Sequence, residues 1–295
     1  VKAANAQAAG AVGVIIADNA AGALPPGLGG TDATVTIPAL SVRQVDGNAI
    51  RAQLADANPD TATLFRGVGV GRDGTIDGMI ISHEWGHYIS NRLVGNASGL
   101  SNQKGRAMGE GWADFHSLLS VVKAEDGPGG PTSDFSDNYV QGSYASGDSY
   151  FGIRRYPYST QLSVSPLTFR YTVNGVALPT TPPPAFGATG ADNSQVHNTG
   201  TIWAAMLWEC YAGILNDTLG GMPRLTFADA RERMKEYIVG GYKPTPSAPT
   251  MVEARDAILA TIAANDIDDF EICAAGFAKR GLGILAVDAP RDSTT

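Results

Sequence analysis

Residues 79–89 read Met-Ile-Ile-Ser-His-Glu-Trp-Gly-His-Tyr-Ile, and this stretch decides how the rest of the chain is interpreted. Its apolar flanks favour a partly buried helix, which we expect from about Asp77 to Leu93. On such a helix His83 and His87 lie about 40° apart around the axis and about 6 Å apart along it. Their imidazoles can therefore bind one metal ion, while Glu84 can reach a water beside that ion without binding the metal. The pattern predicts a zinc hydrolase in which glutamate is the general base.

A zinc site of this kind needs a third protein ligand. One class uses a later histidine on the same segment, and it is excluded because the required glycine is Ser90 and the required histidine is Leu93. The other class takes a carboxylate from a later helix. Glu110 meets this need in the sequence Gly-Glu-Gly-Trp-Ala-Asp that starts at residue 109. Asp114 follows one helical turn later on the same face, where it can accept a hydrogen bond from the far nitrogen of a metal-bound histidine.

The segment that carries these acids is expected to be a helix over residues 108–124. Trp112 and Phe115 make it a buried helix, so a solvated acidic face does not account for the two carboxylates. His116 offers a competing imidazole, but it lies about 240° around the helix from Glu110. We therefore expect Glu110, rather than His116, to complete the metal site.

Taken together, these motifs resemble the fungalysin family of secreted metalloendopeptidases, which are relatives of thermolysin with glutamate as third zinc ligand. The resemblance continues through residues 152–160, 196–209 and 277–283, and it covers about Asp73 to Gly283. It implies an α+β fold, with a small α/β segment followed by a mainly α-helical zinc peptidase lobe. It also implies one catalytic Zn²⁺, protein or peptide substrates and secretion from the cell.

The resemblance assigns further roles in the cleft. His197 matches the histidine that stabilises the oxyanion, and Asp192 matches the carboxylate that orients it; a carboxylate-held imidazole suits a site of developing negative charge. Arg154 resembles the arginine that binds a substrate carbonyl, although its neighbour Arg155 is an alternative. Glu84 is expected to take the proton of the attacking water and deliver it to the leaving amine.

One position departs from the thermolysin pattern. Thermolysin carries a transition-state tyrosine between the second histidine and the third ligand, whereas here that interval holds only Tyr88, on the wrong side of the helix. Either His197 acts without such a tyrosine, or Tyr156 or Tyr158 replaces it.

The opening segment, residues 1–66, resembles part of a protease-associated domain. It is expected to contain helices at 2–9 and 45–54 and strands at 12–17 and 34–40. The alternative is a plain βα structural unit. Residues 67–288 would then form the zinc peptidase region and 289–295 a flexible tail. Because thermolysin-like enzymes carry a β-rich lobe before the zinc helix, we expect the chain to be an incomplete C-terminal portion of a longer precursor.

The composition limits which classes of binding partner the chain can have. The chain of 295 residues has 21 Lys and Arg against 29 Asp and Glu, a net charge of −8, so it is a poor candidate for binding nucleic acid. Its apolar runs are shorter than the roughly 18 residues that membrane insertion requires. Three loop acids could bind Ca²⁺, but no complete calcium-loop spacing is present. They are Asp134, Asp137 and Asp148.

Two questions remain open at this point, the state of the cysteines and the activity of the chain. Cys210 and Cys273 could form a disulfide or stay as buried thiols. The chain as a whole could be a catalytically incompetent zinc-binding or protein-binding fragment of such a peptidase, or it could hydrolyse a non-peptide substrate. The intact set of candidate residues favours the peptidase.

Overall fold

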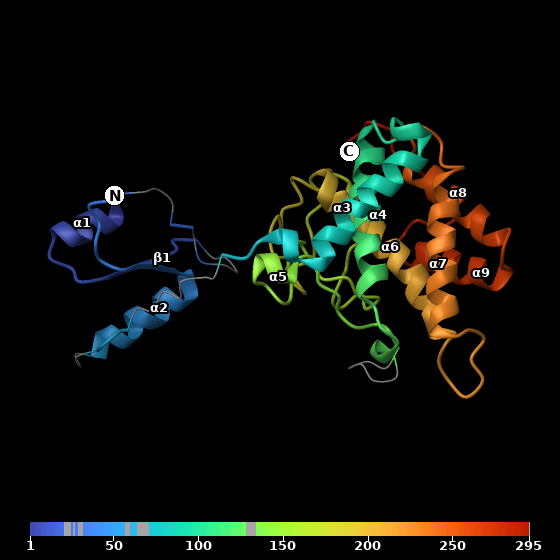
Figure 1. Cartoon of the computed structure of the whole chain (residues 1–295). Helices are drawn as coiled ribbons and strands as arrows, with labels where there is room; N and C mark the ends of the chain where they lie inside the picture. The colour runs from blue at the N-terminus through green and yellow to red at the C-terminus, as the bar shows by residue number, and fades with distance from the viewer. Residues whose placement is uncertain are drawn as a thin grey trace. The chain divides into compact units, whose positions relative to one another are not determined.

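The computed structural model describes residues 1–20, 25, 27–28, 32–56, 60–63, 71–127 and 134–294. The chain divides into two compact units, Val1–Gly71 and Arg72–Thr295, and each is described by itself (Figure 1). The boundary predicted between residues 66 and 67 lies outside the described residues and stays a prediction.

The first unit is a small α/β segment, as expected. Its elements in chain order are α1 (Lys2–Ala8), β1 (Val14–Ala17), β2 (Ala39–Val42), α2 (Gln44–Gln53) and a 3₁₀ turn, Leu54–Asp56. The two strands pair in parallel, with Val14 opposite Ala39 and Ala17 opposite Val42. The helices start and end near their predicted positions because their apolar spacing is a local signal.

The second strand is displaced from its predicted position at 34–40. Residues 34–37 do not pair with β1, because the side chain of Gln7 binds their backbone. Its Oε1 accepts hydrogen bonds from the backbone N–H groups of Thr36 (2.7 Å) and Ile37 (3.2 Å), and its Nε2 donates to the carbonyl of Thr34 (2.8 Å). The strand therefore starts only at Ala39.

The second unit is mainly helical, which confirms the predicted fold class. Its helices are α3 (Gly78–Leu93), α4 (Gln103–Val121), α5 (Ser143–Ser146), α6 (Val196–Asn216), α7 (Phe227–Tyr242), α8 (Met251–Ala263) and α9 (Ile267–Lys279). Short 3₁₀ turns occupy Gly74–Ile76, Gly95–Ala97, Ala124–Asp126 and Phe169–Thr172. Helix α3 packs on α4, α4 packs on α6, and α6 packs on α9 (Figure 1).

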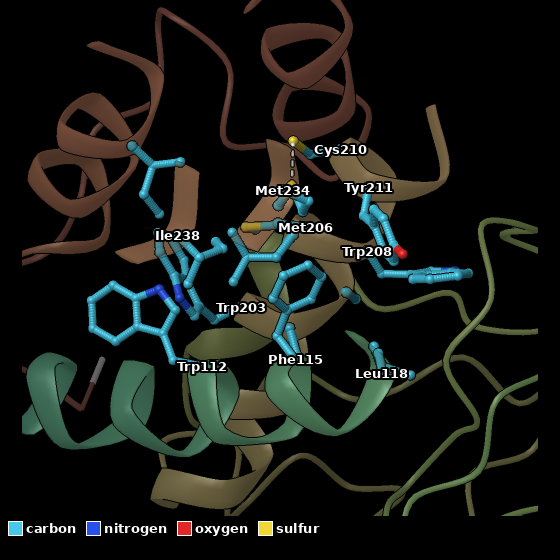
Figure 2. Packing of buried hydrophobic residues seen from close by; sticks show 14 of the residues in the cluster. Trp112, Phe115, Leu118, Trp203, Met206, Trp208, Cys210, Tyr211, Met234 and Ile238 are labelled. Atoms are coloured by element: carbon cyan, nitrogen blue, oxygen red, sulfur yellow. Dashed lines mark hydrogen bonds between the residues drawn. The ribbon is translucent and has the colours of Figure 1, made fainter. Parts of the chain in front are cut away.

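The core of this unit gathers around α6, which is buried along almost its whole length. Trp203 of α6 meets Trp112 of α4 edge to face, with ring centroids 5.5 Å apart (Figure 2). Such aromatic pairs contribute about 0.5–1.5 kcal/mol beyond the area they bury. Within the described part of the chain, no helix is both long and apolar enough to cross a membrane.

Glycines allow α3, α4 and α6 to approach closely. A Cβ at Gly86 of α3 would lie 2.7 Å from the Cα of Ala113 on α4. A Cβ at Gly200 of α6 would lie 2.7 Å from the carbonyl oxygen of Ala107 on α4. Only glycine fits such contacts, so the glycines bring the histidine helix and the acid helix within side-chain reach.

Cys210 and Cys273 form a disulfide, which settles one of the open alternatives. The bond joins α6 to α9 across 63 positions of sequence. In the chain-entropy model a loop of this length stabilises the folded state by about 4 kcal/mol. The sulfur of Cys210 also lies 3.9 Å from that of Met234, inside the core (Figure 2).

The flexible tail predicted over 289–295 stays a prediction, but Asp292 in this segment makes a defined contact. Its carboxylate accepts a hydrogen bond from the backbone N–H of Gln103 (3.1 Å), at the start of α4. Just before the tail, Asp288 accepts one from the backbone N–H of Met251 (2.6 Å), at the start of α8. The backbone N–H groups in the first turn of a helix have no acceptor inside the helix and need one elsewhere. The composition of the C-terminal segment gave no sign that its acidic residues supply these acceptors.

Candidate metal and active site

Three potential metal ligands converge where α3 packs on α4. The Nε2 atoms of His83 and His87 lie 3.0 Å apart, and each lies 3.3 Å from Oε2 of Glu110. Among the described residues, this is the one group of histidine, cysteine and acidic side chains placed to hold a metal ion. The helical spacing of the histidines predicted this meeting, and Asp134, Asp137 and Asp148 form no such group.

The geometry of the group fits a zinc ion. Ligand atoms about 2.0–2.1 Å from a tetrahedral Zn²⁺ lie about 3.3–3.4 Å from one another, close to the distances observed here. The Oε2 atom of Glu110 is buried and makes no hydrogen bond, although imidazoles surround it. Burial raises the pKa of Glu110, but the neighbouring imidazoles of His83 and His87 outweigh burial and hold that pKa well below its usual range. A cation between these atoms would bind one lone pair from each of the three ligand atoms.

Asp114 holds the inner histidine in place. Its Oδ1 lies 2.7 Å from Nδ1 of His83, and its carboxylate also accepts two hydrogen bonds from Arg154, at 2.6 and 2.7 Å. The hydroxyl of Tyr158 donates a further hydrogen bond to it. Burial raises the pKa of Asp114, but the charge of Arg154 and the bond to His83 outweigh burial, so the carboxyl stays ionised. An ionised acceptor keeps the proton of His83 on Nδ1 and leaves Nε2 free for the metal.

Arg154 and the two candidate tyrosines, Tyr156 and Tyr158, contact parts of the chain that the sequence did not indicate. Arg154 is buried and donates hydrogen bonds from Nε and Nη2 to Asp114, while its predicted role in binding a substrate carbonyl stays a prediction. Tyr158 is fully buried and donates to Asp114, whereas the hydroxyl of Tyr156 lies 3.3 Å from the backbone carbonyls of Pro179 and Pro182. Neither tyrosine presents its hydroxyl to the metal ligands. The sequence offered Tyr158 as a candidate transition-state tyrosine, but its irregular segment gave no signal for the contact with Asp114.

Removing the Asp114 carboxylate is expected to weaken both the fold and the metal site. Asp114→Ala leaves the charge of Arg154 buried without its partner, which should lower the free energy of unfolding by about 3–5 kcal/mol. Loss of the support for His83 should lower zinc affinity about 10- to 100-fold. Urea unfolding and chelator competition measure the two effects.

The matched control is Glu232→Ala, which breaks an exposed ion pair with Lys235 (3.0 Å). It should change the free energy of unfolding by less than about 1 kcal/mol. An Asp114→Ala variant as stable as this control would contradict the role of the buried pair.

His116, the competing ligand, lies outside the metal group. Its Nε2 is 2.9 Å from the hydroxyl of Tyr242, and its ring packs beside Gly86. Burial lowers the pKa of His116 to about 4, so the side chain is neutral at pH 7. Its absence from the group formed by His83, His87 and Glu110 agrees with the angular argument from the sequence.

The burial of His116 predicts a loss of stability in acid. Its pKa is about 4 in the folded chain and about 6.5 when unfolded. Between these values the unfolded chain binds the extra proton, so stability falls as pH falls from 6.5 to 4, by up to about 3 kcal/mol. Urea unfolding at pH 7 and pH 4.5 should show a smaller loss for His116→Gln than for the parent chain. Equal losses would refute the assignment.

His197 approaches the metal ligands from α6. Its Nε2 lies 3.3 Å from Oε2 of Glu110, and its side chain is 46% exposed. At the other ring nitrogen, Nδ1, the hydrogen-bond partner is Nε2 of Gln195, at 2.7 Å. Gln195 thus makes the contact that was predicted for the Asp192 carboxylate. The Asp192 backbone carbonyl accepts a hydrogen bond from the Gln195 N–H (3.1 Å). The position of Gln195 directly before a predicted helix was the only sequence signal for its role.

A hollow of about 570 Å³ opens beside His197. Its walls include Arg154, Arg155, Asp192 and Phe186. Arg155 is buried and donates from Nη1 to Oδ1 of Asn193 (2.7 Å). Glu84 is exposed on α3, next to His83. The predicted residues Arg154, Asp192 and His197 thus line one open space. Glu84 is not among the residues that line it and is placed by its position on α3, next to the ligand His83.

Similar proteins identify the family of the chain. Residues 27–286 match the sequence profile of the family described as fungalysin metallopeptidase, and residues 1–50 match that of the PA domain. An extracellular metalloproteinase of Aspergillus terreus is 32% identical over 230 residues, which is 72% of this chain and 31% of that protein. Another, from Aspergillus fumigatus, is 34% identical over 232 residues, or 75% of this chain and 32% of that protein.

A third relative, the extracellular metalloproteinase of Fusarium vanettenii, is 34% identical over 227 residues, covering 72% of this chain and 31% of that protein. The chain thus spans about a third of the length of the relatives it matches. The profile match covers most of the chain and includes every metal-ligand candidate. By this match and by the site it contains, the chain belongs to the fungalysin metallopeptidase family.

Proposed function

We propose that this chain carries the catalytic centre of a secreted zinc-dependent metalloendopeptidase. The observation that carries the proposal is the convergence of His83, His87 and Glu110 at the mutual distances of tetrahedral zinc ligands. The names of the relatives, which are extracellular metalloproteinases, support secretion and proteolysis. Residues 67–288 are proposed as the catalytic region and 1–66 as a protease-associated-like segment.

The residues of the chain have distinct tasks in this mechanism. When bound, Zn²⁺ polarises the scissile carbonyl and lowers the pKa of the attacking water. Glu84 accepts the proton of that water and passes it to the leaving amine. The Nε2 side of His197 faces the ligand cluster, where it can donate to the oxyanion as negative charge develops.

Supporting residues keep this arrangement rigid. Asp114 orients His83, and Arg154 together with Tyr158 holds Asp114 by charge-assisted hydrogen bonds. The hollow beside His197 offers arginine donors and an aromatic wall, which suit the carbonyl groups and side chains of an extended peptide.

The decisive experiment pairs zinc analysis with a cleavage assay on the purified chain. Elemental analysis should find about one Zn²⁺ per chain, and cleavage of a quenched fluorescent peptide mixture should stop with a chelator and return with Zn²⁺. A chain that binds no zinc would refute the site. Zinc binding without cleavage would favour the alternative of a zinc-binding fragment without activity.

A further inference from the structure

We propose that Gln195 sets the tautomer of His197, so that Nδ1 accepts a hydrogen bond from the Gln195 amide and Nε2 carries the ring proton. The catalytic consequence rests on the function proposed above. The tautomer itself depends only on contacts within the chain.

The orientation of the Gln195 amide follows from its place at the start of α6. Its Oε1 accepts hydrogen bonds from the backbone N–H groups of His197 (2.8 Å) and Asn198 (3.1 Å), which have no partners inside the helix. Because both of these groups are donors, the amide oxygen must face them. The amide nitrogen must then be the atom that lies 2.7 Å from Nδ1 of His197.

An amide nitrogen carries two hydrogens and no acceptor lone pair. Nδ1 of His197 must therefore accept the hydrogen bond, and a neutral imidazole then carries its proton on Nε2. That nitrogen faces the ligand cluster, 3.3 Å from Oε2 of Glu110. A carboxylate at Nδ1 would demand the opposite arrangement, with the proton on Nδ1.

Hydrogen bonds at Asp192 and Ser194 fix the loop before α6, which holds Gln195 in its position beside His197. The Asp192 carbonyl accepts hydrogen bonds from the backbone N–H of Gln195 (3.1 Å) and from the side chain of Asn198 (2.8 Å). The side chain of Gln103 on α4 donates to the carbonyl of Ser194 (2.6 Å). The helix that supplies Glu110 thus also anchors the loop that supplies Gln195.

The direct test is nitrogen-15 NMR of the histidine rings in the full chain, because a ring nitrogen that carries a proton has a different chemical shift from one that does not. His197→Gln identifies the His197 signals. We expect a pyridine-type signal at Nδ1 and a pyrrole-type signal at Nε2. A proton on Nδ1 in the neutral ring would overturn the proposal.

Two variants separate Gln195 from Asp192. Gln195→Ser keeps the helix cap, because serine is a favoured capping residue, but its side chain is too short to reach Nδ1. It should shift the His197 signals toward a mixture of tautomers, whereas Asp192→Asn should leave them unchanged. The reverse result, in which Asp192→Asn shifts the signals and Gln195→Ser does not, would assign the role to Asp192.

Kinetics test the catalytic consequence. Gln195→Ser should lower kcat about five- to tenfold, as expected for one hydrogen bond, while KM and zinc content stay at parent values. A shifted tautomer with unchanged kcat would refute the catalytic part. If no form of the chain cleaves peptides, the proposed function fails, and the NMR result still decides the role of Gln195.

Discussion

Glu84→Gln is expected to bind zinc like the parent chain and to lose peptide hydrolysis by about 10²- to 10⁴-fold, the usual contribution of a general base. Glu84 is exposed and adjoins His83 on α3 without belonging to the ligand group. Glutamine keeps the size of the side chain and removes its ability to take a proton. Zinc content and kcat, measured on the same sample, give both quantities.

The matched control for this variant is Glu236→Gln, which changes an exposed glutamate on α7. It should keep full activity. Equal loss of zinc and turnover in Glu84→Gln would mean that Glu84 supports the metal rather than the proton transfer.

His83→Ala is expected to lower zinc affinity by about a thousandfold. Protein-bound structural zinc gains about 10–16 kcal/mol from its whole ligand set, so loss of one nitrogen ligand should cost several kcal/mol. His83 is the central ligand, because it contacts His87, Glu110 and Asp114. Competition with a zinc indicator measures the change in affinity.

His116→Ala provides the comparison, since His116 is an imidazole on α4 that faces Tyr242 instead of the ligand group. Its zinc affinity should stay within a few-fold of the parent. Similar zinc loss in both variants would show that the metal depends on helix packing in general and would contradict the assigned ligands.

The sequence alone predicted the metal ligands because their arrangement is mostly local. Histidines one turn apart must share a helix face, and α3 and α6 start within a residue or two of their predicted positions. The acidic pattern at residues 109–114 added Glu110, and the family resemblance added His197. Both residues reach the histidines only because helices that are far apart in sequence pack together. Their meeting in the structure agrees with that expectation.

What the sequence did not predict depends on contacts from irregular segments. Tyr158 and Arg154 reach Asp114 from a part of the chain without helical or strand periodicity, so no pattern places their side chains. Gln195 binds His197 through an amide orientation that only the helix start determines. The displaced start of strand β2 also depends on a contact without a sequence pattern. The side chain of Gln7, and not strand β1, is the hydrogen-bond partner of the backbone at Thr36.

The glycine contacts between helices have a practical meaning for directed evolution of this chain. Gly86 and Gly200 sit where neighbouring backbone leaves no room for a Cβ, so libraries that vary them would mostly sample misfolded proteins. Ile153 and Phe186 line the hollow and are substantially exposed. Libraries that aim at new peptide selectivity should therefore vary positions that line the hollow, such as Ile153 and Phe186, and keep Gly86 and Gly200 unchanged.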